Sequence, residues 1–486
     1  MTDIRSNTIA GVKWSAIDKF SVQGVQFVIS IILARLLQPD VFGVIAMLTI
    51  FIAISQTFVD SGFSNALIRK VDRTADDFST VFIFNIVVGI LCFVVFSLCA
   101  PFIAEFYGMP ILTEVIPVLA ITLILDSLRI VQTSIFTINI DFRTISIINF
   151  SSALISGICG IILAYSGFGV WSLVMQTLIR SALASFLTFC MSKWKPLWKF
   201  SISSFKSLFS YGSKLLAAGL INTIYSNISP LVIGRFYTSK DLGLYDRGRQ
   251  FGILPSNYIV QIFVRVTFPI LSQIQDDQQL LIQTYRKYIK LTSLVMFFIM
   301  ALIVALAKPI IMILLTPLWS DAIIYLQLFC LAEMFNHITN LNLNLLQVKG
   351  YSNYFLKLEI IKKSISFALL ACAIPFGIIA ICISQIIYSQ IALYINTYYT
   401  QKLFGVGYFT QMKDFLKYLV AAFAACIPSF MMVSFDFPYL LTILLGFFSA
   451  LLLYFMFFLK HDDVTQQMRE EFSRVVKKYL AKGGCR

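Results

Sequence analysis

The sequence is poor in the residues that most enzymes and soluble domains require. Only 13% of its 486 residues are charged, whereas soluble domains contain about 25%. It has two histidines, His337 and His461, and none of its nine cysteines belongs to a Cys-x-x-Cys pair. A phosphate-binding glycine-rich loop and a G-x-S-x-G motif are both missing. We therefore expect no enzyme activity, no metal and no cofactor.

Hydrophobic residues dominate instead, at 58% of the chain. They form runs of roughly 20 residues or more, which is enough to cross a hydrocarbon core of about 30 Å. The first run ends near Leu37 and is too long for a signal peptide, so we expect it to remain as a membrane helix. The sequence predicts an all-α membrane protein with about fourteen transmembrane helices. Their approximate bounds are 10–36, 41–67, 78–103, 112–136, 144–165, 169–191, 207–235, 242–270, 289–312, 321–346, 353–374, 377–399, 416–434 and 438–459.

Lysine and arginine are distributed unevenly between alternate loops. If the N-terminus is cytoplasmic, the inside loops and tail contain twenty-three of these residues and the outside loops contain four, Arg35, Arg235, Lys240 and Lys308. By the positive-inside rule, both termini are then cytoplasmic. Because the net charge of +14 lies mostly in short loops between spans, it does not indicate a nucleic-acid partner.

Three short motifs recur in the same order about 200 residues apart. Each pair shares glycine, alanine or a basic residue at the same spacing, which predicts two parallel copies of a six-helix unit. Parallel repeats of this kind place a substrate site between two halves of a transporter. The pairs are residues 11–16 with 212–217, 32–35 with 232–235, and 168–170 with 376–378.

Eleven basic and six acidic residues lie inside the predicted spans. A charge at the bilayer centre costs about 2.5–3.5 kcal/mol on insertion scales, so such residues pair or line a polar cavity. The excess of positive charge predicts a cavity for an anionic substrate. The basic residues are Lys13, Lys19, Arg129, Arg180, Lys214, Arg247, Arg249, Arg265, Lys357, Lys362 and Lys363, and the acidic ones are Asp18, Asp60, Asp126, Asp246, Glu333 and Glu359.

The basic residues differ in what surrounds them in sequence. Arg180, Lys214, Arg247 and Arg265 have no partner at helical spacing, and the planar fork of arginine suits phosphate oxygens. The last three lysines of the set are either an entry path for an anion or side chains that extend to the headgroups. The substrate-binding candidates are therefore Lys13, Lys19, Arg129, Arg180, Lys214, Arg247, Arg249 and Arg265.

Acidic and neutral polar residues form a second set of candidates. The tenth span carries Glu333, His337, Asn340 and Asn344 as an unbroken polar stripe, which either lines a cavity or joins neighbouring helices. Asp126 and Arg129 have the i, i+3 spacing of an ion pair, structural or substrate-facing. Asp60, Asp126 and Glu333 are either proton or cation coupling sites or neutral structural groups.

Residues 32–43, Ile-Leu-Ala-Arg-Leu-Leu-Gln-Pro-Asp-Val-Phe-Gly, resemble a signature of bacterial polysaccharide flippases of the Wzx type. These proteins belong to the MOP exporter superfamily. Further similar stretches include Phe-Gly-Val-Trp-Ser-Leu-Val at 168–174, Leu-Gly-Leu-Tyr-Asp-Arg at 242–247 and Phe268-Pro269. The resemblance covers residues 30 to 270 by motif and the remainder by helix pattern.

The resemblance implies two six-helix lobes that form a V-shaped central cavity, with two extra C-terminal helices. It implies that oligosaccharide linked to undecaprenyl pyrophosphate crosses the bacterial inner membrane for synthesis of a polymer such as O-antigen. It also implies membrane lipids, a polymerase and chain-length machinery as partners. The family's cationic cavity maps onto Lys13, Lys19, Lys214 and Arg247, and less well onto Arg249, where the sequence departs from the family.

The predicted organisation divides the chain into five parts. They are an N-lobe at 1–192, a cytoplasmic linker at 193–206, a C-lobe at 207–402, helices 13 and 14 at 403–460, and a tail at 461–486. The tail is either an amphipathic helix on the inner leaflet or a solvated segment.

Three other classes of protein are open alternatives. A multidrug or organic-cation exporter of the same superfamily would need carboxylates to dominate its cavity, whereas basic residues outnumber acids here. A polymerase or membrane glycosyltransferase would need a long outside loop or a nucleotide-sugar domain. A scaffold without transport activity would not retain so many charges in its membrane spans.

The predicted topology can be checked with reporter fusions. Because both termini are expected in the cytoplasm, fusions at 193–206 and 400–415 should report inside and fusions near 107–111 and 435–438 should report outside. A reversed signal at any of these sites would contradict both the topology and the parallel repeat.

Overall fold

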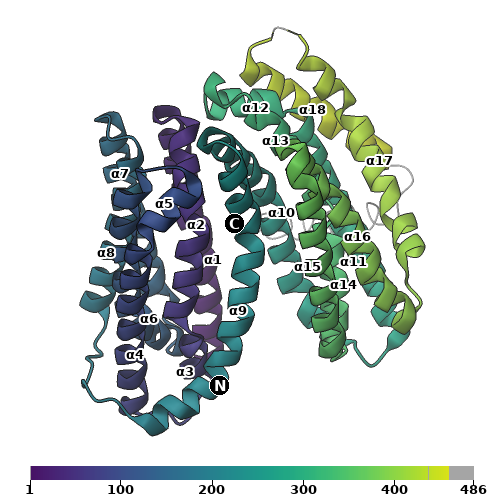
Figure 1. The fold of residues 1–486 in the computed structure, drawn as a ribbon. Helices are drawn as coiled ribbons and strands as arrows, with labels where there is room; N and C mark the ends of the chain where they lie inside the picture. The colour runs from purple at the N-terminus through teal and green to yellow at the C-terminus, as the bar shows by residue number, and fades with distance from the viewer. Residues whose placement is uncertain (1, 436, 459–486) are drawn as a thin grey trace, which may run out of the picture. The chain divides into compact units, whose positions relative to one another are not determined.

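The computed structural model describes residues 2–435 and 437–458, without the side chains of residues 2–13, 15–19, 352, 355 and 356. The described chain is helical and contains no β-strand (Figure 1). It divides into two compact units, Met1–Gly243 and Leu244–Arg486. The predicted tail at 461–486 lies outside the described residues.

Within its described residues, the first unit contains nine helices and the first turn of a tenth. They are α1 (Thr2–Leu36), α2 (Pro39–Asp60), α3 (Phe63–Arg69), α4 (Ala75–Leu98), α5 (Ala100–Tyr107), α6 (Leu112–Ile138), α7 (Phe142–Tyr165), α8 (Val170–Met191), α9 (Ile202–Phe236) and the start of α10 (Ser239–Gln273).

The second unit contains the rest of α10 and the remaining helices. They are α11 (Gln278–Ala305), α12 (Ala307–Leu314), the 3-10 turn η1 (Pro317–Trp319), α13 (Ala322–Glu333), α14 (Asn336–Val348), α15 (Ser352–Ala373), the 3-10 turn η2 (Ile374–Phe376), α16 (Ile378–Phe404), α17 (Tyr408–Met432) and α18 (Tyr439–Phe458).

The fourteen predicted spans are confirmed as helices of membrane-spanning length. Eleven segments of the described chain are apolar enough to cross a membrane by length and composition, and α1, α6 and α15, of 35, 27 and 22 residues, are long helices outside that set. Three helices begin eight or more residues earlier than expected, α1 at Thr2, α11 at Gln278 and α17 at Tyr408. Asp277 caps α11 by accepting a hydrogen bond from Leu280 N at 3.0 Å. The N-terminal parts of α11 and α17 are joined by a salt bridge in which Arg286 Nε lies 2.7 Å from Asp414 Oδ2. Hydropathy alone does not detect such a pair.

In the first unit, α4, α6, α7 and α8 lie side by side (Figure 1), with α1 against α7 and α9 against α2. One core cluster includes Phe63, Phe82 and Val131, all at most 2% exposed. The start of α4 is fixed by polar groups, because Thr74 and Asp77 form a capping box and Lys70 Nζ lies 2.6 Å from Asp77 Oδ2. A buried carboxylate is thereby paired and hydrogen-bonded, as burial requires.

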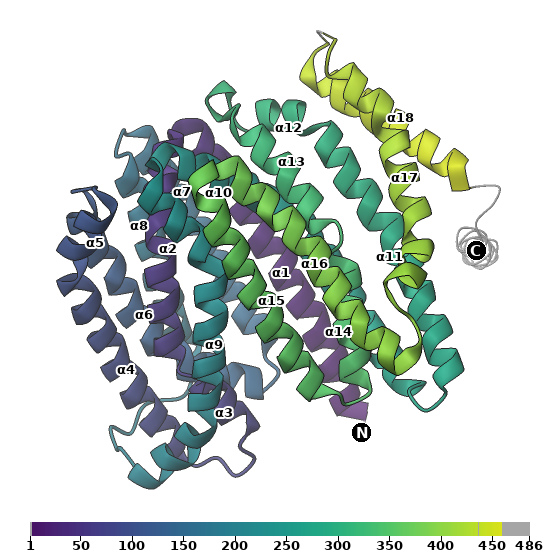
Figure 2. The same cartoon turned by 45° about the vertical axis from the view of Figure 1, so that its right-hand side comes forward.

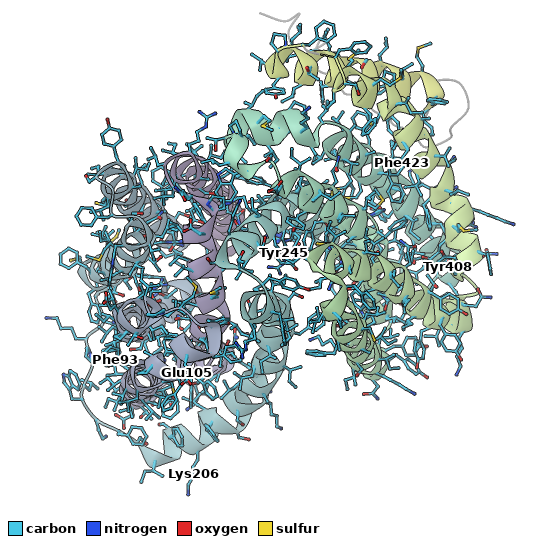
Figure 3. All side chains as sticks on the ribbon, turned by 45° about the horizontal axis from the view of Figure 1, so that its top comes forward. Phe93, Glu105, Lys206, Tyr245, Tyr408 and Phe423 are labelled. Carbon is cyan, nitrogen blue, oxygen red and sulfur yellow. The ribbon has the colours of Figure 1, made fainter. Side chains whose placement is uncertain are left out.

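In the second unit, α16 packs against both α13 and α15, and α17 packs between α11 and α18 (Figure 2). Tyr245 on α10 contacts Tyr325 and Phe329 of α13 with ring centroids 6.1 and 5.3 Å away (Figure 3). This close approach needs Gly248 and Gly252, because a Cβ at either position would lie 2.7 Å from the Cβ of a residue of α13. Small residues four apart are a common device for close helix contact in membranes.

The internal repeat predicted from the motifs is reflected in the helix boundaries. The first long helices of the two repeats are α1 and α9. They end at Leu36 and Phe236, which are 200 residues apart like the motifs at 32–35 and 232–235. Gly169 and Gly377 precede α8 and α16, and both have positive φ, 53° and 97°. The boundary between the two compact units lies at Gly243, after α9, and α9 packs on α2 of the first unit. The predicted lobe boundaries at 192 and 207 therefore stay a prediction. The V-shaped cavity also stays a prediction.

The first turns of α2 and α10 approach each other so closely that two glycines are required. A Cβ at Gly43 would overlap the carbonyl oxygen of Ser239, and one at Gly243 would overlap the carbonyl oxygen of Pro39. All four residues belong to the first unit. Gly43 and Gly243 are 200 residues apart, as are Pro39 and Ser239, so the contact is reciprocal between the two repeats.

Gly43→Ala should destabilise the protein through this contact. A methyl group at this position must displace backbone, and overpacking of this kind costs about 1–3 kcal/mol. The melting temperature of the purified protein in detergent measures the effect. Gly24→Ala on α1 is the matched control, because a Cβ there meets nothing within 4 Å. Equal melting temperatures for the two variants would contradict the close contact.

Candidate anion-binding and polar sites

Charged and neutral polar side chains from three helices meet in the first unit. Within α6, Arg129 Nε donates to Asp126 Oδ1 at 3.0 Å, and Ser181 Oγ of α8 donates to the same oxygen at 2.7 Å. Arg180 of α8 donates both terminal nitrogens to the side-chain oxygen of Gln26 on α1, at 2.5 and 2.6 Å, with the Gln26 amide oriented for this contact. We call these five residues the arginine cluster.

Small polar residues on α8 make this arrangement possible. Ser181 and Ser185 are one helical turn apart and face α6, where Ser185 Oγ donates to the Leu125 carbonyl at 2.5 Å. Both serines are buried. Serine side chains allow two helices to approach and join them by hydrogen bonds. The cluster is therefore part of the contact between α6 and α8, extended to α1 by Arg180.

The arginine cluster retains positive charge. It contains two guanidinium groups and one carboxylate, and the Gln26 amide that holds Arg180 is neutral. Arg129 and Asp126 act electrostatically on Arg180, so the three charges lie in one field. Because the Arg129 side chain is 30% exposed, the cluster is accessible. Two arginine forks with one neutralising acid can bind the oxygens of a phosphate-type anion.

A second polar cluster surrounds Glu333 at the end of α13. Ser256 of α10 and Asn336 of α14 donate to Glu333 Oε2 at 3.2 and 3.1 Å. Asn340 extends the cluster by donating to Asn336 Oδ1 at 2.7 Å, and Arg249 acts electrostatically on Glu333. We call these five residues the glutamate cluster.

The predicted unbroken stripe on the tenth span is wrong. The helix is interrupted at Met334 and Phe335, and the residues after the break do not all share one environment. His337 is buried and hydrogen-bonded to Ser293 of α11 at 2.9 Å. Asn344 is also buried and donates to Thr267 of α10 at 2.9 Å. These two residues connect helices, whereas Glu333 and Asn340 belong to one cluster.

Arg247 lies in a different environment from the exposed cations. It is only 4% exposed, its guanidinium lies over the Trp319 ring at 5.7 Å, and it donates to Gln250 at 3.4 Å. In contrast, Lys214 on α9 and Arg265 on α10 are exposed. Neither forms an ion pair with any residue that the structure describes.

Three further candidates complete the predicted set. Asp60, the last residue of α2, is half-buried and forms no ion pair within the described residues. The side chains of Lys13 and Lys19 lie outside the described residues. No group of three or more histidine, cysteine, aspartate or glutamate side chains that could hold a metal occurs in the part of the chain that the structure describes.

Several residues of the two clusters were not predicted. Ser181, Ser256 and Asn336 each hydrogen-bond to a carboxylate on another helix, and Trp319 supports Arg247. The sequence contained one usable signal, the serines of α8 at 181 and 185 directly after Arg180. The other contacts depend on how helices pack and have no counterpart in local spacing.

The fold and the paired charges define an all-helical, multi-pass membrane protein. In a comparison of structures, the chain matches the lipid II flippase MurJ in an inward-closed conformation with a TM-score of 0.75, at 15% identity over 92% of this chain and 98% of MurJ. It also matches an inward-facing multidrug resistance MATE family transporter of the MOP superfamily with a TM-score of 0.59, at 14% identity over 81% of this chain and 98% of that one. The chain therefore shares its fold with these two proteins.

Sequence comparison identifies the family. Residues 32–324 match the family described as polysaccharide biosynthesis protein, and the chain belongs to that family. The chain is 25% identical over 365 residues to the lipopolysaccharide biosynthesis protein WzxC of Escherichia coli strain K12, covering 74% of this chain and 73% of that one. It is 26% identical over 352 residues to the teichuronic acid biosynthesis protein TuaB of Bacillus subtilis strain 168, covering 72% and 73%. The predicted resemblance to polysaccharide flippases is confirmed.

Removing the acid of the arginine cluster should destabilise the fold. Asp126→Ala leaves Arg129 without its ion pair and Ser181 without its acceptor, and a hydrogen bond to a charged group contributes about 1.5–3 kcal/mol. The measurement is the melting temperature in detergent. Asp76→Ala is the control, because its partner Lys199 is 66% exposed and exposed pairs contribute about 0–1 kcal/mol. The double change Asp126→Ala with Arg129→Met should recover part of the loss. A loss no greater than that of Asp76→Ala would contradict this role.

Proposed function

We propose that this chain is a flippase that moves an oligosaccharide linked to undecaprenyl pyrophosphate across the bacterial cytoplasmic membrane by alternating access. Membership of the polysaccharide biosynthesis family and the MurJ-like fold support this proposal. The relatives WzxC and TuaB are a lipopolysaccharide and a teichuronic acid biosynthesis protein, so the proposal names the carrier lipid and leaves the sugar open.

The observation that carries the proposal is the arginine cluster. Pyrophosphate is an anion with several oxygens, and the Arg180 fork at present donates to a neutral amide oxygen of Gln26. An anionic oxygen in place of that amide would form a stronger, charge-assisted bond. Arg129 can bind the same anion, while the salt bridge to Asp126 holds the Arg129 side chain in position. The cluster can therefore bind the pyrophosphate without an added metal ion.

Neutral amides would bind the sugar, and an acidic side chain would take part in the coupling step. Amides such as Asn336 and Asn340 hydrogen-bond sugar hydroxyls readily. We assign coupling to Glu333 rather than to Asp126, because Asp126 forms a salt bridge with Arg129, whereas the donors to Glu333 Oε2 are the neutral side chains of Ser256 and Asn336. Acidic groups in membrane spans are common sites of proton or cation transfer.

The proposal includes an orientation and partners. Both termini face the cytoplasm, as the distribution of lysine and arginine favours. The substrate enters from the inner leaflet and leaves in the outer one, where a polysaccharide polymerase with its chain-length machinery would receive it. Lys13, Lys19, Lys214, Arg247, Arg249 and Arg265 are the further cations that we propose along this route.

An exporter of organic cations is the main rival within the superfamily. Such a protein needs an uncompensated carboxylate to bind its substrate. In the described structure, Asp126 is paired with Arg129, and Glu333 lies in the field of Arg249. The acid of the arginine cluster is therefore already neutralised by an arginine, which favours an anionic substrate at that cluster.

Loss of Arg180 should stop polymer export without loss of the protein. A charge-assisted contact contributes about 1.5–3 kcal/mol, so Arg180→Ala should weaken substrate binding about ten- to hundredfold. Arg180→Lys should be partly active, because a point charge cannot reproduce the bidentate fork. Polymer at the cell surface, normalised to the amount of protein in the membrane, measures the effect.

Two further variants separate binding from folding. Lys214 is exposed, so Lys214→Ala should reduce export while the protein remains at its normal level. Lys199→Ala is the control, because Lys199 pairs with Asp76 at an exposed position in the linker. Normal export by well-expressed Arg180→Ala and Lys214→Ala variants would refute an anion site built from these cations.

A further inference from the structure

The first unit contains an apolar pocket built from helices that do not contribute to the arginine cluster. It has a volume of about 510 Å³. Its walls come from α2, α4, α5 and α9 and include Phe51, Phe96, Phe102, Phe106 and Leu231. Phe102 is 73% exposed and Phe106 is 38% exposed, so the pocket opens on the surface. A pocket of this lining at the surface of a membrane protein accepts a hydrocarbon chain.

The walls of the pocket are held in place by specific contacts. Tyr107 Oη donates to the Met47 carbonyl at 3.1 Å and thereby fixes α5 to α2. Gly234 lets α9 approach α5, because a Cβ there would lie 2.9 Å from Tyr107 Cε1. Just before this contact, Pro230 lies inside α9, where proline removes a backbone hydrogen bond and bends a helix. The pocket is therefore held open beside Pro230, where Leu231 lines it.

A cation lies at the edge of this pocket. The Arg235 guanidinium lies 5.1 Å from the centroid of the Phe106 ring, which lines the pocket. Arg235 is exposed and forms no ion pair within the described residues. The one acidic residue of α5, Glu105 (Figure 3), does not line the pocket. An apolar pocket with an uncompensated positive charge at its edge matches a ligand with a hydrocarbon chain and an anionic head.

We propose that this pocket binds an anionic phospholipid of the surrounding bilayer, with one acyl chain between Phe51, Phe96 and Phe102 and the phosphate at Arg235. Charge complementarity selects an anionic over a zwitterionic lipid, since basic side chains at the membrane surface attract anionic headgroups. The site is independent of the arginine cluster and of the proposed transport function. By the predicted topology, Arg235 places it at the outer end of the membrane.

A second apolar pocket does not share this property. It has a volume of about 330 Å³ and lies between α11 and α18. Its lining includes Phe298, Tyr454 and Phe458 but no charged residue. Without a cation it has no preference among headgroups, so the proposal applies to the pocket beside Arg235 only.

Cys99 provides a direct measurement, because it lines the pocket and is exposed. The full chain, with every other cysteine replaced by serine, is reconstituted in phosphatidylcholine with or without phosphatidylglycerol. The initial rate of Cys99 alkylation by N-ethylmaleimide is then measured. Phosphatidylglycerol should slow alkylation about fivefold, the factor that corresponds to about 1 kcal/mol per basic residue at an anionic surface. Arg235→Gln should abolish this difference between the two lipids.

Three controls make the outcome decisive. A protein whose single cysteine is Cys190, which is exposed on α8, should react equally in both lipids. Lys240→Gln, which removes an exposed cation that does not line the pocket, should leave the effect on Cys99 intact. Protection that persists in Arg235→Gln, or that appears equally at Cys190, would overturn the proposal. Protection by undecaprenyl phosphate but not by phosphatidylglycerol would show that the occupant is a prenyl lipid instead.

Discussion

Hydrocarbon offers no hydrogen-bond partner, and this constraint governs where each polar group of the chain can lie. Backbone groups satisfy it by forming helices, and side chains satisfy it by meeting partners on neighbouring helices. Asn342, Thr400 and Gln411 illustrate the result, because their side chains hydrogen-bond to one another between α14, α16 and α17 at 2.9–3.2 Å. The polar residues of this protein therefore hold helices together as well as providing sites.

Compensation of charge is complete at some of these positions and incomplete at others. Asp414 is held by Arg286 and Lys290 at the polar starts of α11 and α17, where the basic groups are partly exposed to water. In the arginine cluster, by contrast, one carboxylate serves two guanidinium groups and a neutral amide takes the remaining contact. A cluster needed for stability alone would contain matched charges. The unmatched arginine is the feature that links this structure to an anionic ligand.

The sequence predicted the helices far better than the sites. An apolar run of sufficient length forms a membrane helix almost regardless of its neighbours, so the fourteen spans could be counted in advance. The i, i+3 pair of Asp126 and Arg129 was also predicted, because both residues lie on one helix. The bond from Arg180 to Gln26 and the stacking of Arg247 on Trp319 join residues far apart in sequence. These two contacts depend on how the helices pack, which cannot be inferred from the spacing of residues within one helix.

The paired glycines show how an internal repeat constrains packing as well as helix length. If α2 and α10 were unrelated, a single glycine could permit one close approach between them. Here Gly43 meets the carbonyl of Ser239 and Gly243 meets the carbonyl of Pro39, so each helix contributes both a glycine and a carbonyl. A reciprocal contact between equivalent residues is the property of a two-fold related pair. Both equivalent positions must therefore be glycine for the two helices to approach. The motif spacing of 200 residues thus reflects this contact between the two copies as well as their common length.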